Sequence, residues 1–124
     1  MAEKKKILYV QTSGTDTPEK LYAPLILAQT ARAMDVEPVV YFLGKGLKNL
    51  IKEEAEKVKV GDFPSLFEVL QQTASQGVKL MACQQSLQLF GGAIKKEDLI
   101  EEATIAGAAT LNDLALEADT VLTF

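Results

Sequence analysis

Short apolar runs alternate with amphipathic segments along the whole chain. The apolar runs are typical of strands that are covered on both faces, and they lie at residues 6–12, 39–43, 78–83, 103–106 and 120–124. Segments with apolar residues at helical spacing lie at residues 17–34, 47–54, 65–76, 87–90, 96–100 and 108–118. This alternation predicts a single three-layer α/β/α domain over residues 1–124, with a mainly parallel sheet of about five strands.

Local signals add detail to this outline. Thr17 can cap the first helix, and Pro24 predicts a kink or a restart within it, because proline lacks the N–H that the preceding turn needs. Residues 58–60 are interpreted as a short extended piece. In the last helical segment we expect Ala115 to face the core together with its leucine neighbours.

Composition and charge narrow the class of protein. Hydrophobic residues make up 48% of the chain, enough to fill one core, yet no apolar run approaches the roughly 18 to 20 residues of a membrane span. The net charge is −4, and glutamates interleave with the lysines of residues 45–59, which argues against a one-sided basic surface for nucleic acid. The polar start and the single cysteine predict a cytoplasmic protein with neither a membrane nor a nucleic acid as partner.

The absence of histidine and the presence of only one cysteine exclude several kinds of chemistry. The sequence contains no histidine, which removes Ser-His-Asp and Cys-His catalysis and histidine-ligated zinc. It contains one cysteine, which removes a CxxC redox pair and a cluster held by thiolates. We therefore expect no metal and no organic cofactor, and enzymatic activity stays uncertain.

The single cysteine, Cys83, ends the third apolar run. The polar residues Gln84, Gln85 and Ser86 follow it and open the next amphipathic segment. A strand that turns directly into a helix aims its last residue at the helix N-terminus, where the partial positive charge favours a thiolate over a thiol. A free cysteine is also among the most commonly buried residues, so an inert core role stays open.

Small polar turns follow the first two strands. Ser13 and Gly14 close the first, while Gly44 and Gly46 follow the second. In an open α/β sheet, ligands bind at the carboxyl edge of the strands, so these residues are candidates to line a small site beside Cys83. The alternative is that both segments are tight turns, because neither has the spacing of a phosphate-binding loop.

The segment after the cysteine is rich in apolar residues. Leu87, Leu89 and Phe90 crowd a short helix, and burying all of them within a 124-residue monomer is difficult. They predict an oligomer interface close to Cys83. Core packing is the competing explanation for some of them.

An ordered set of motifs resembles the DsrE/DsrF-like family, also called YchN-like. The most specific motifs are the segment Gly-Val-Lys-Leu-Met-Ala-Cys-Gln-Gln-Ser and the ending Ala-Asp-Thr-Val-Leu-Thr-Phe. The similarity covers nearly the whole chain, at residues 7–14, 39–46, 77–86, 106–110 and 118–124. This resemblance implies a small cytoplasmic α/β protein with a YchN-like fold that assembles into homo-oligomers, often trimers or hexamers.

The resemblance also implies a chemistry. In sulfur-relay members, the cysteine in the position of Cys83 accepts sulfur as a persulfide from a donor protein and passes it to an acceptor protein. The expected function is therefore that of a sulfur carrier or sulfurtransferase. Two other classes remain open: a non-catalytic oligomeric scaffold with an inert core cysteine, and a small-ligand binding module.

Overall fold

A five-stranded parallel sheet organises the chain, as a computed structural model describes it for residues 4–124. The strands are β1 (Lys6–Gln11), β2 (Glu37–Phe42), β3 (Lys79–Cys83), β4 (Ala103–Ala106) and β5 (Thr120–Thr123). They lie in the order β4-β3-β2-β1-β5, and every neighbouring pair is parallel. The predicted sheet is confirmed.

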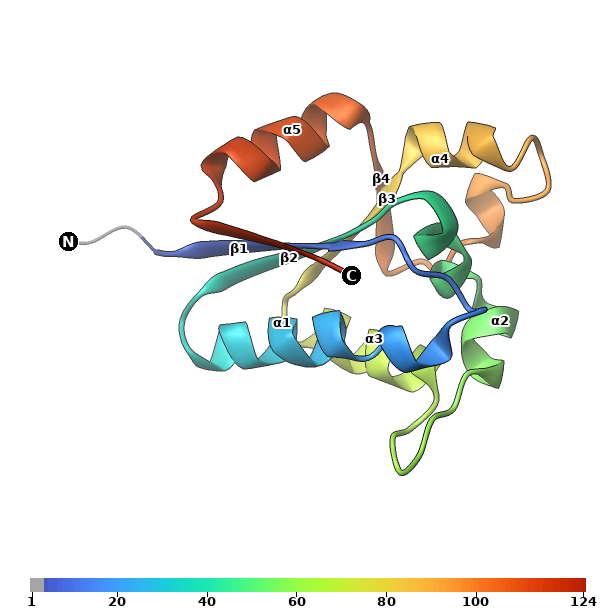
Figure 1. Cartoon of the computed structure of the whole chain (residues 1–124), viewed down its shortest axis with the longest axis horizontal. Helices are drawn as coiled ribbons and strands as arrows, with labels where there is room; N and C mark the ends of the chain where they lie inside the picture. Colours follow the sequence, from blue (N-terminus) through green and yellow to red (C-terminus); the bar gives the residue numbers. More distant parts are fainter. Residues whose placement is uncertain (1–3) are drawn as a thin grey trace.

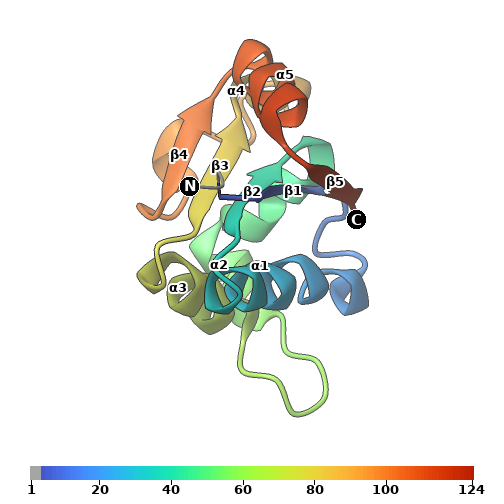
Figure 2. The same cartoon turned by 90° about the vertical axis from the view of Figure 1, so that its left-hand side faces the viewer.

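Helices cover both faces of this sheet (Figures 1 and 2). One face carries α1 (Ala23–Ala33), α2 (Lys52–Lys57) and α3 (Leu66–Ser75), and the opposite face carries α4 (Gln84–Leu89) and α5 (Ala108–Glu117). Three 3₁₀ helices complete the described part of the chain, namely η1 (Pro18–Lys20), η2 (Gly44–Leu50) and η3 (Lys96–Asp98). The three-layer α/β/α architecture is therefore also confirmed.

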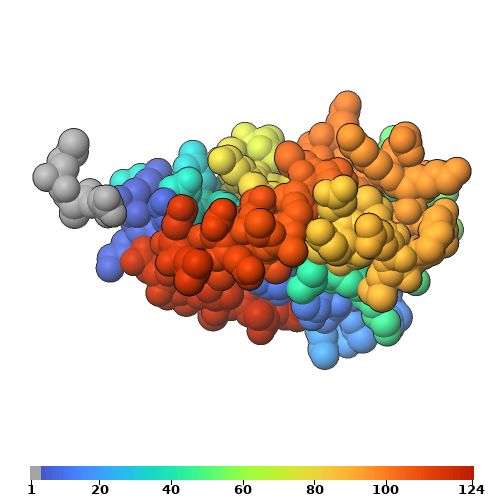
Figure 3. Space-filling model, turned by 90° about the horizontal axis from the view of Figure 1, so that it is seen from above, coloured from blue at the N-terminus to red at the C-terminus, as the bar shows by residue number. Residues whose placement is uncertain are grey.

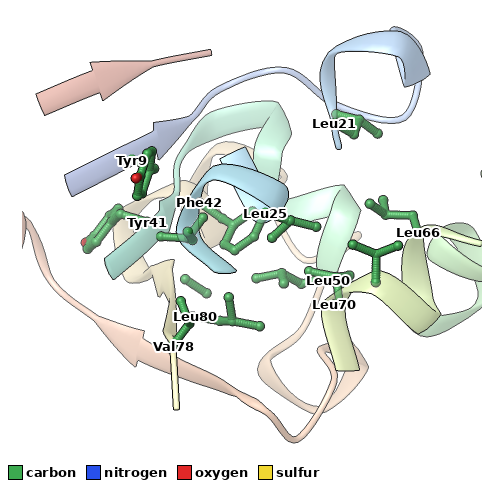
Figure 4. Close-up of a cluster of buried hydrophobic side chains, with 14 of the residues drawn as sticks. Tyr9, Leu21, Leu25, Tyr41, Phe42, Leu50, Leu66, Leu70, Val78 and Leu80 are labelled. Atoms are coloured by element: carbon green, nitrogen blue, oxygen red, sulfur yellow. The ribbon is translucent and has the colours of Figure 1, made fainter. Parts of the chain in front are cut away.

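The main core lies between the sheet and the face that α1 and α3 cover. Leu25 of α1 and Leu70 of α3 point toward Phe42 and Leu80 of the central strands (Figure 4). Each of these four side chains is at most 1% exposed. Burying a leucine or phenylalanine side chain stabilises a fold by about 1.5–3 kcal/mol, so this face dominates the stability of the domain.

The opposite face is less completely covered. Within the described residues, α5 contains no fully buried side chain, and all four residues of β5 are exposed. Figure 3 looks onto this face, where α5 and α4 form the outer layer. The expectation for Ala115 was wrong: Leu111 and Leu114 are half-buried against the core, and this orientation of the helix turns Ala115 to solvent.

Two local expectations changed in the folded chain. Thr17 occupies the N-cap position of η1 instead of α1, and its side chain accepts no capping hydrogen bond; its hydroxyl donates to the Gly14 carbonyl. Helix α1 begins only at Ala23, with Pro24 in its first turn. Pro24 thus marks the restart that its missing N–H predicts. The segment predicted as one helix at 47–54 is divided between η2 and α2 at Ile51. Residues 58–60 pair with no strand, and Val58 has the extended backbone expected there, with φ −80° and ψ 119°.

Candidate functional site

Cys83 lies at the junction of β3 and α4. It is the last residue of the strand and the N-terminal cap of the helix, with φ −72° and ψ 120°. Its strand neighbour is Ala106, at the end of β4. The residue is 3% exposed. The sequence therefore placed Cys83 correctly at the carboxyl edge of the sheet, and the fold buries most of its surface.

A cavity of about 370 Å³ opens onto this cysteine. Its wall is almost entirely apolar, and none of the described residues that form it is charged. Five elements or their ends contribute to it, through Leu43, Gly44, Cys83, Gln85, Ser86, Leu89, Ala108 and Leu111. The Cys83 thiol donates a long hydrogen bond of 3.9 Å to the Oε1 atom of Gln85. A small uncharged group or an apolar segment fits this wall.

Ser86 connects the two sides of the cavity. Its Oγ atom accepts a hydrogen bond of 2.8 Å from the backbone N–H of Gly44, at the start of η2. Gly44 has φ +58°, a left-handed conformation that glycine adopts without strain. The serine side chain is nearly buried, so this bond holds the η2 turn against the first turn of α4.

Ser13, Gly14 and Gly46 lie outside the cavity, in the neighbouring turn. The Ser13 carbonyl accepts a hydrogen bond of 2.9 Å from the side-chain amide of Asn49. A Cβ atom on Gly46 would lie 2.2 Å from the Gln11 carbonyl oxygen, and one on Gly14 would lie 2.8 Å from the Lys45 carbonyl oxygen. The glycines allow this close backbone packing at the end of β1.

The remaining predicted residues divide between the cavity and the surface. Gln84 is exposed and does not line the cavity. Leu87 and Phe90 are half-buried and pack against the core, and the Lys48 ammonium lies 5.6 Å from the centre of the Phe90 ring. Leu89, by contrast, is 71% exposed at the rim of the cavity.

Tyr41 is a neighbour of Cys83 that was not among the residues predicted for the site. This side chain is fully buried, and its hydroxyl donates to the carbonyl oxygens of Ala106 and Gly107 at 3.1 and 2.9 Å. Burial raises the pKa of Tyr41 to about 12, and the charge and hydrogen bonding of Cys83 add to the rise. The available signal was strand parity, because Tyr41 pairs with Met81, which stands two residues before Cys83 on the same face of the sheet.

A second cavity lies between α5 and the amino-terminal part of the sheet. It measures about 150 Å³ and has apolar walls that include Leu8, Val39 and Met81. Lys6 and Glu117 contribute to its charged rim and approach each other to 3.8 Å. Among residues 4–124, no group of three potential metal ligands comes together. No helix in the same range is long and apolar enough to cross a membrane.

The chain is thus a small parallel α/β protein whose single cysteine lies at the carboxyl edge of its sheet. The model of the DsrE/DsrF-like family matches residues 5–124, and the chain belongs to this family. The crystal structure of the YchN protein from E. coli superimposes with a TM-score of 0.77 at 22% identity, over 97% of this chain and 99% of that chain. The similarity of the two folds confirms the YchN-like architecture.

A curated relative is also similar in sequence. It is the uncharacterized protein MJ0760 of Methanocaldococcus jannaschii, with 32% identity over 105 residues. The match covers 85% of this chain and 38% of that protein. The chain thus spans less than half the length of this relative.

Proposed function

We propose that the protein is a sulfur carrier, which accepts sulfane sulfur as a persulfide on Cys83 and passes it to the thiol of a partner protein. Membership of the DsrE/DsrF-like family, which is associated with sulfur relay, supports this function. The observation that carries the proposal is the position of Cys83 in the wall of an uncharged cavity at the carboxyl edge of the sheet.

The transfer needs only the cysteine and two partners. The Cys83 thiolate attacks the outer sulfur of a donor persulfide, R–S–SH. A new bond forms between the Cys83 sulfur and that outer sulfur, while the donor S–S bond breaks and R–S⁻ leaves as a thiolate. The outer sulfur keeps its proton, so Cys83 becomes a persulfide without an added oxidant or reductant. Attack by an acceptor thiolate on the outer sulfur then regenerates the Cys83 thiolate.

The cavity suits such an intermediate. A persulfide is easily oxidised or reduced when solvent thiols and oxidants reach it, and Cys83 is 3% exposed. Its apolar wall also excludes charged small thiols, which leaves an uncharged donor group or an apolar partner segment as the substrate class. A carrier of this kind hands its sulfur to selected partners instead of to solvent.

The burial of Cys83 also favours a second candidate function. A cysteine with this exposure, packed among apolar residues, can be an inert core residue of an oligomeric scaffold. The apolar cavity would then serve either no ligand or a small ligand held without covalent chemistry.

Mass spectrometry of the native protein separates these functions. An uncharged low-molecular-weight persulfide donor is expected to add about 32 Da, the mass of one sulfur atom, to Cys83. Cys83→Ser is expected to abolish the adduct and leave the fold intact. On the native protein, an acceptor protein with an exposed cysteine is expected to remove the adduct. If the native cysteine stays unmodified while the urea-unfolded chain reacts, the protein is a scaffold and not a sulfur carrier. If a ligand binds Cys83→Ser as tightly as it binds the native chain, the protein is a ligand-binding module.

We further propose a homo-oligomer, a trimer or a hexamer, in the cytoplasm. The exposed apolar side chains on the α4 and α5 face and on β5 support assembly. They are Leu89, Leu116, Val121 and Leu122. Stable interfaces usually bury well over roughly 1,000 Å² in total. Sedimentation is expected to show a species several times larger than 13.5 kDa, and a monomer at micromolar concentration would refute assembly.

A further inference from the structure

Tyr41 and Cys83 face each other diagonally on neighbouring strands. Tyr41 pairs with Met81 in the parallel register of β2 and β3, and Cys83 stands two residues further along β3. Successive side chains of a strand point to opposite faces, so all three share the face that α5 covers. Diagonal neighbours of this kind lie within reach of an aromatic side chain.

The Tyr41 hydroxyl has a single proton, but more than one hydrogen-bond acceptor lies within its reach. The carbonyls of Ala106 and Gly107 both accept from it, at 3.1 and 2.9 Å. Ala106 is the strand partner of Cys83, so these carbonyls end β4 directly beside the cysteine. A hydroxyl proton rotates to the acceptor with the most negative charge, and a thiolate is more negative than a carbonyl oxygen.

We propose that Tyr41 is the positioning residue of the sulfur site. Its hydroxyl donates to the two carbonyls while Cys83 is a neutral thiol, and it turns its proton to the sulfur when Cys83 is a thiolate. This inference rests on the proposed function, because it is the carrier that needs an anionic, nucleophilic sulfur. The proton never leaves the phenol oxygen, so no bond other than hydrogen bonds forms or breaks in this step.

Among the described residues, the cavity wall beside Cys83 offers no charged group that could stabilise a thiolate. The cavity residues from the end of β2, from η2, from α4 and from α5 are all uncharged among those described, and Tyr41 is the titratable side chain that adjoins the thiol. The pKa of Tyr41, raised to about 12, keeps the phenol protonated at every pH at which the cysteine works. In the present contact Gln85 accepts from the thiol through its Oε1 atom, and its side-chain amide would have to turn over before Nε2 could donate to a thiolate.

The test compares Tyr41→Phe with a matched control. Tyr22→Phe also removes a buried hydroxyl that donates to two backbone carbonyls, those of Val58 and Pro64, but on the other face of the sheet. The probe is iodoacetamide, and the readout is the rate of Cys83 alkylation against pH. Losing a hydrogen bond to a charged group is expected to slow alkylation about tenfold at pH 7 and to move the profile up by about one pH unit.

The shape of the alkylation profile against pH distinguishes a positioning role of Tyr41 from a merely structural one. With a positioning role, Tyr41→Phe reaches the native rate at high pH, where the thiolate forms without help, and Tyr22→Phe follows the native profile throughout. A profile of Tyr41→Phe that matches the native one overturns the inference, and so does an equal displacement in both variants. The persulfide assay on the native protein is independent of this result. If no sulfur adduct forms there, the carrier function fails even when the Tyr41→Phe profile shifts.

A second measurement needs no tyrosine substitution, so it can be made even if Tyr41→Phe fails to fold. In Cys83→Ala the neighbouring thiolate is gone, so the pH at which Tyr41 ionises is expected to fall. Ring NMR of isotope-labelled tyrosines follows this titration, with Tyr9 and Tyr22 as internal references whose midpoints stay unchanged. An unchanged Tyr41 midpoint overturns the inference.

Discussion

The hydrogen bond between Ser86 and Gly44 is a discrete link that a single substitution removes. Ser86→Ala deletes the Oγ atom that accepts from the Gly44 N–H at 2.8 Å and leaves the rest of α4 unchanged. Alanine has a better helix propensity than serine, so the local helical preference cannot explain any loss of stability. A destabilised variant therefore reports on the link between η2 and α4.

The size of the effect follows from the burial of the two groups. Leaving a buried donor without a partner costs about 1–3 kcal/mol. Ser86 is 6% exposed, but Gly44 is half-buried, so water partly replaces the lost acceptor. We expect a loss of about 1–2 kcal/mol in the free energy of unfolding. For a chain of 124 residues this corresponds to a fall in melting temperature of about 4–8 °C.

Urea unfolding and thermal melting measure this loss. Ser75→Ala is the matched control, because Ser75 is an exposed helical serine whose hydroxyl donates to the Gln72 carbonyl within α3. The control is expected to stay within about 0.5 kcal/mol of the native protein. Equal stabilities of the two variants would show that the bond does not hold η2 against α4, and the description of the cavity wall would then be wrong.

Three further outcomes test other parts of the structure. Gly46→Ala is expected to destabilise the protein by more than about 2 kcal/mol in urea unfolding, because its Cβ would meet the Gln11 carbonyl at 2.2 Å; an unchanged midpoint contradicts this packing. Because the pKa of Tyr41 is raised in the folded state, the protonated phenol stabilises the fold fully below pH 10, and this stabilisation is expected to disappear as the pH rises through about 12. Tyr41→Phe should flatten this loss of stability at alkaline pH. Leu116→Glu, at a position 84% exposed, is expected to shift an oligomer toward monomers in sedimentation without lowering monomer stability, and a destabilised monomer would show that Leu116 packs within the chain.

The layered fold could be predicted because its signals are local. Continuous apolar runs predict strands buried on both faces, and amphipathic segments between them require parallel connections. The position of Cys83 at the end of β3 follows from the same pattern, because the polar residues after it begin a helix. The helix restart at Pro24 needs only the missing N–H of proline.

The composition of the site could be predicted only in part. Gly44, Gln85 and Ser86 line the cavity beside Cys83 as expected, but the other wall residues depend on the strand register and on how each loop packs. Ser13 and Gly46 end up in the turn beside the cavity because the backbone there packs against Gln11 and Asn49. Tyr41 becomes a neighbour of Cys83 only through the alignment of β2 with β3, and the sequence contains no motif that fixes this alignment. Ala115 faces solvent since α5 contacts the sheet through a narrower stripe than its sequence indicates.

The incomplete burial of α5 has a consequence for how Cys83 is reached. Among the described helices, α5 holds to the sheet without a fully buried side chain, so its free energy of local opening is expected to lie well below that of global unfolding. Ala108 and Leu111 of this helix form part of the cavity wall. Native-state hydrogen exchange should therefore show α5 amides exchanging faster than those of β2, with Cys83 alkylation following the same opening. Equal protection of α5 and β2 would mean that a donor must enter through the cavity mouth alone.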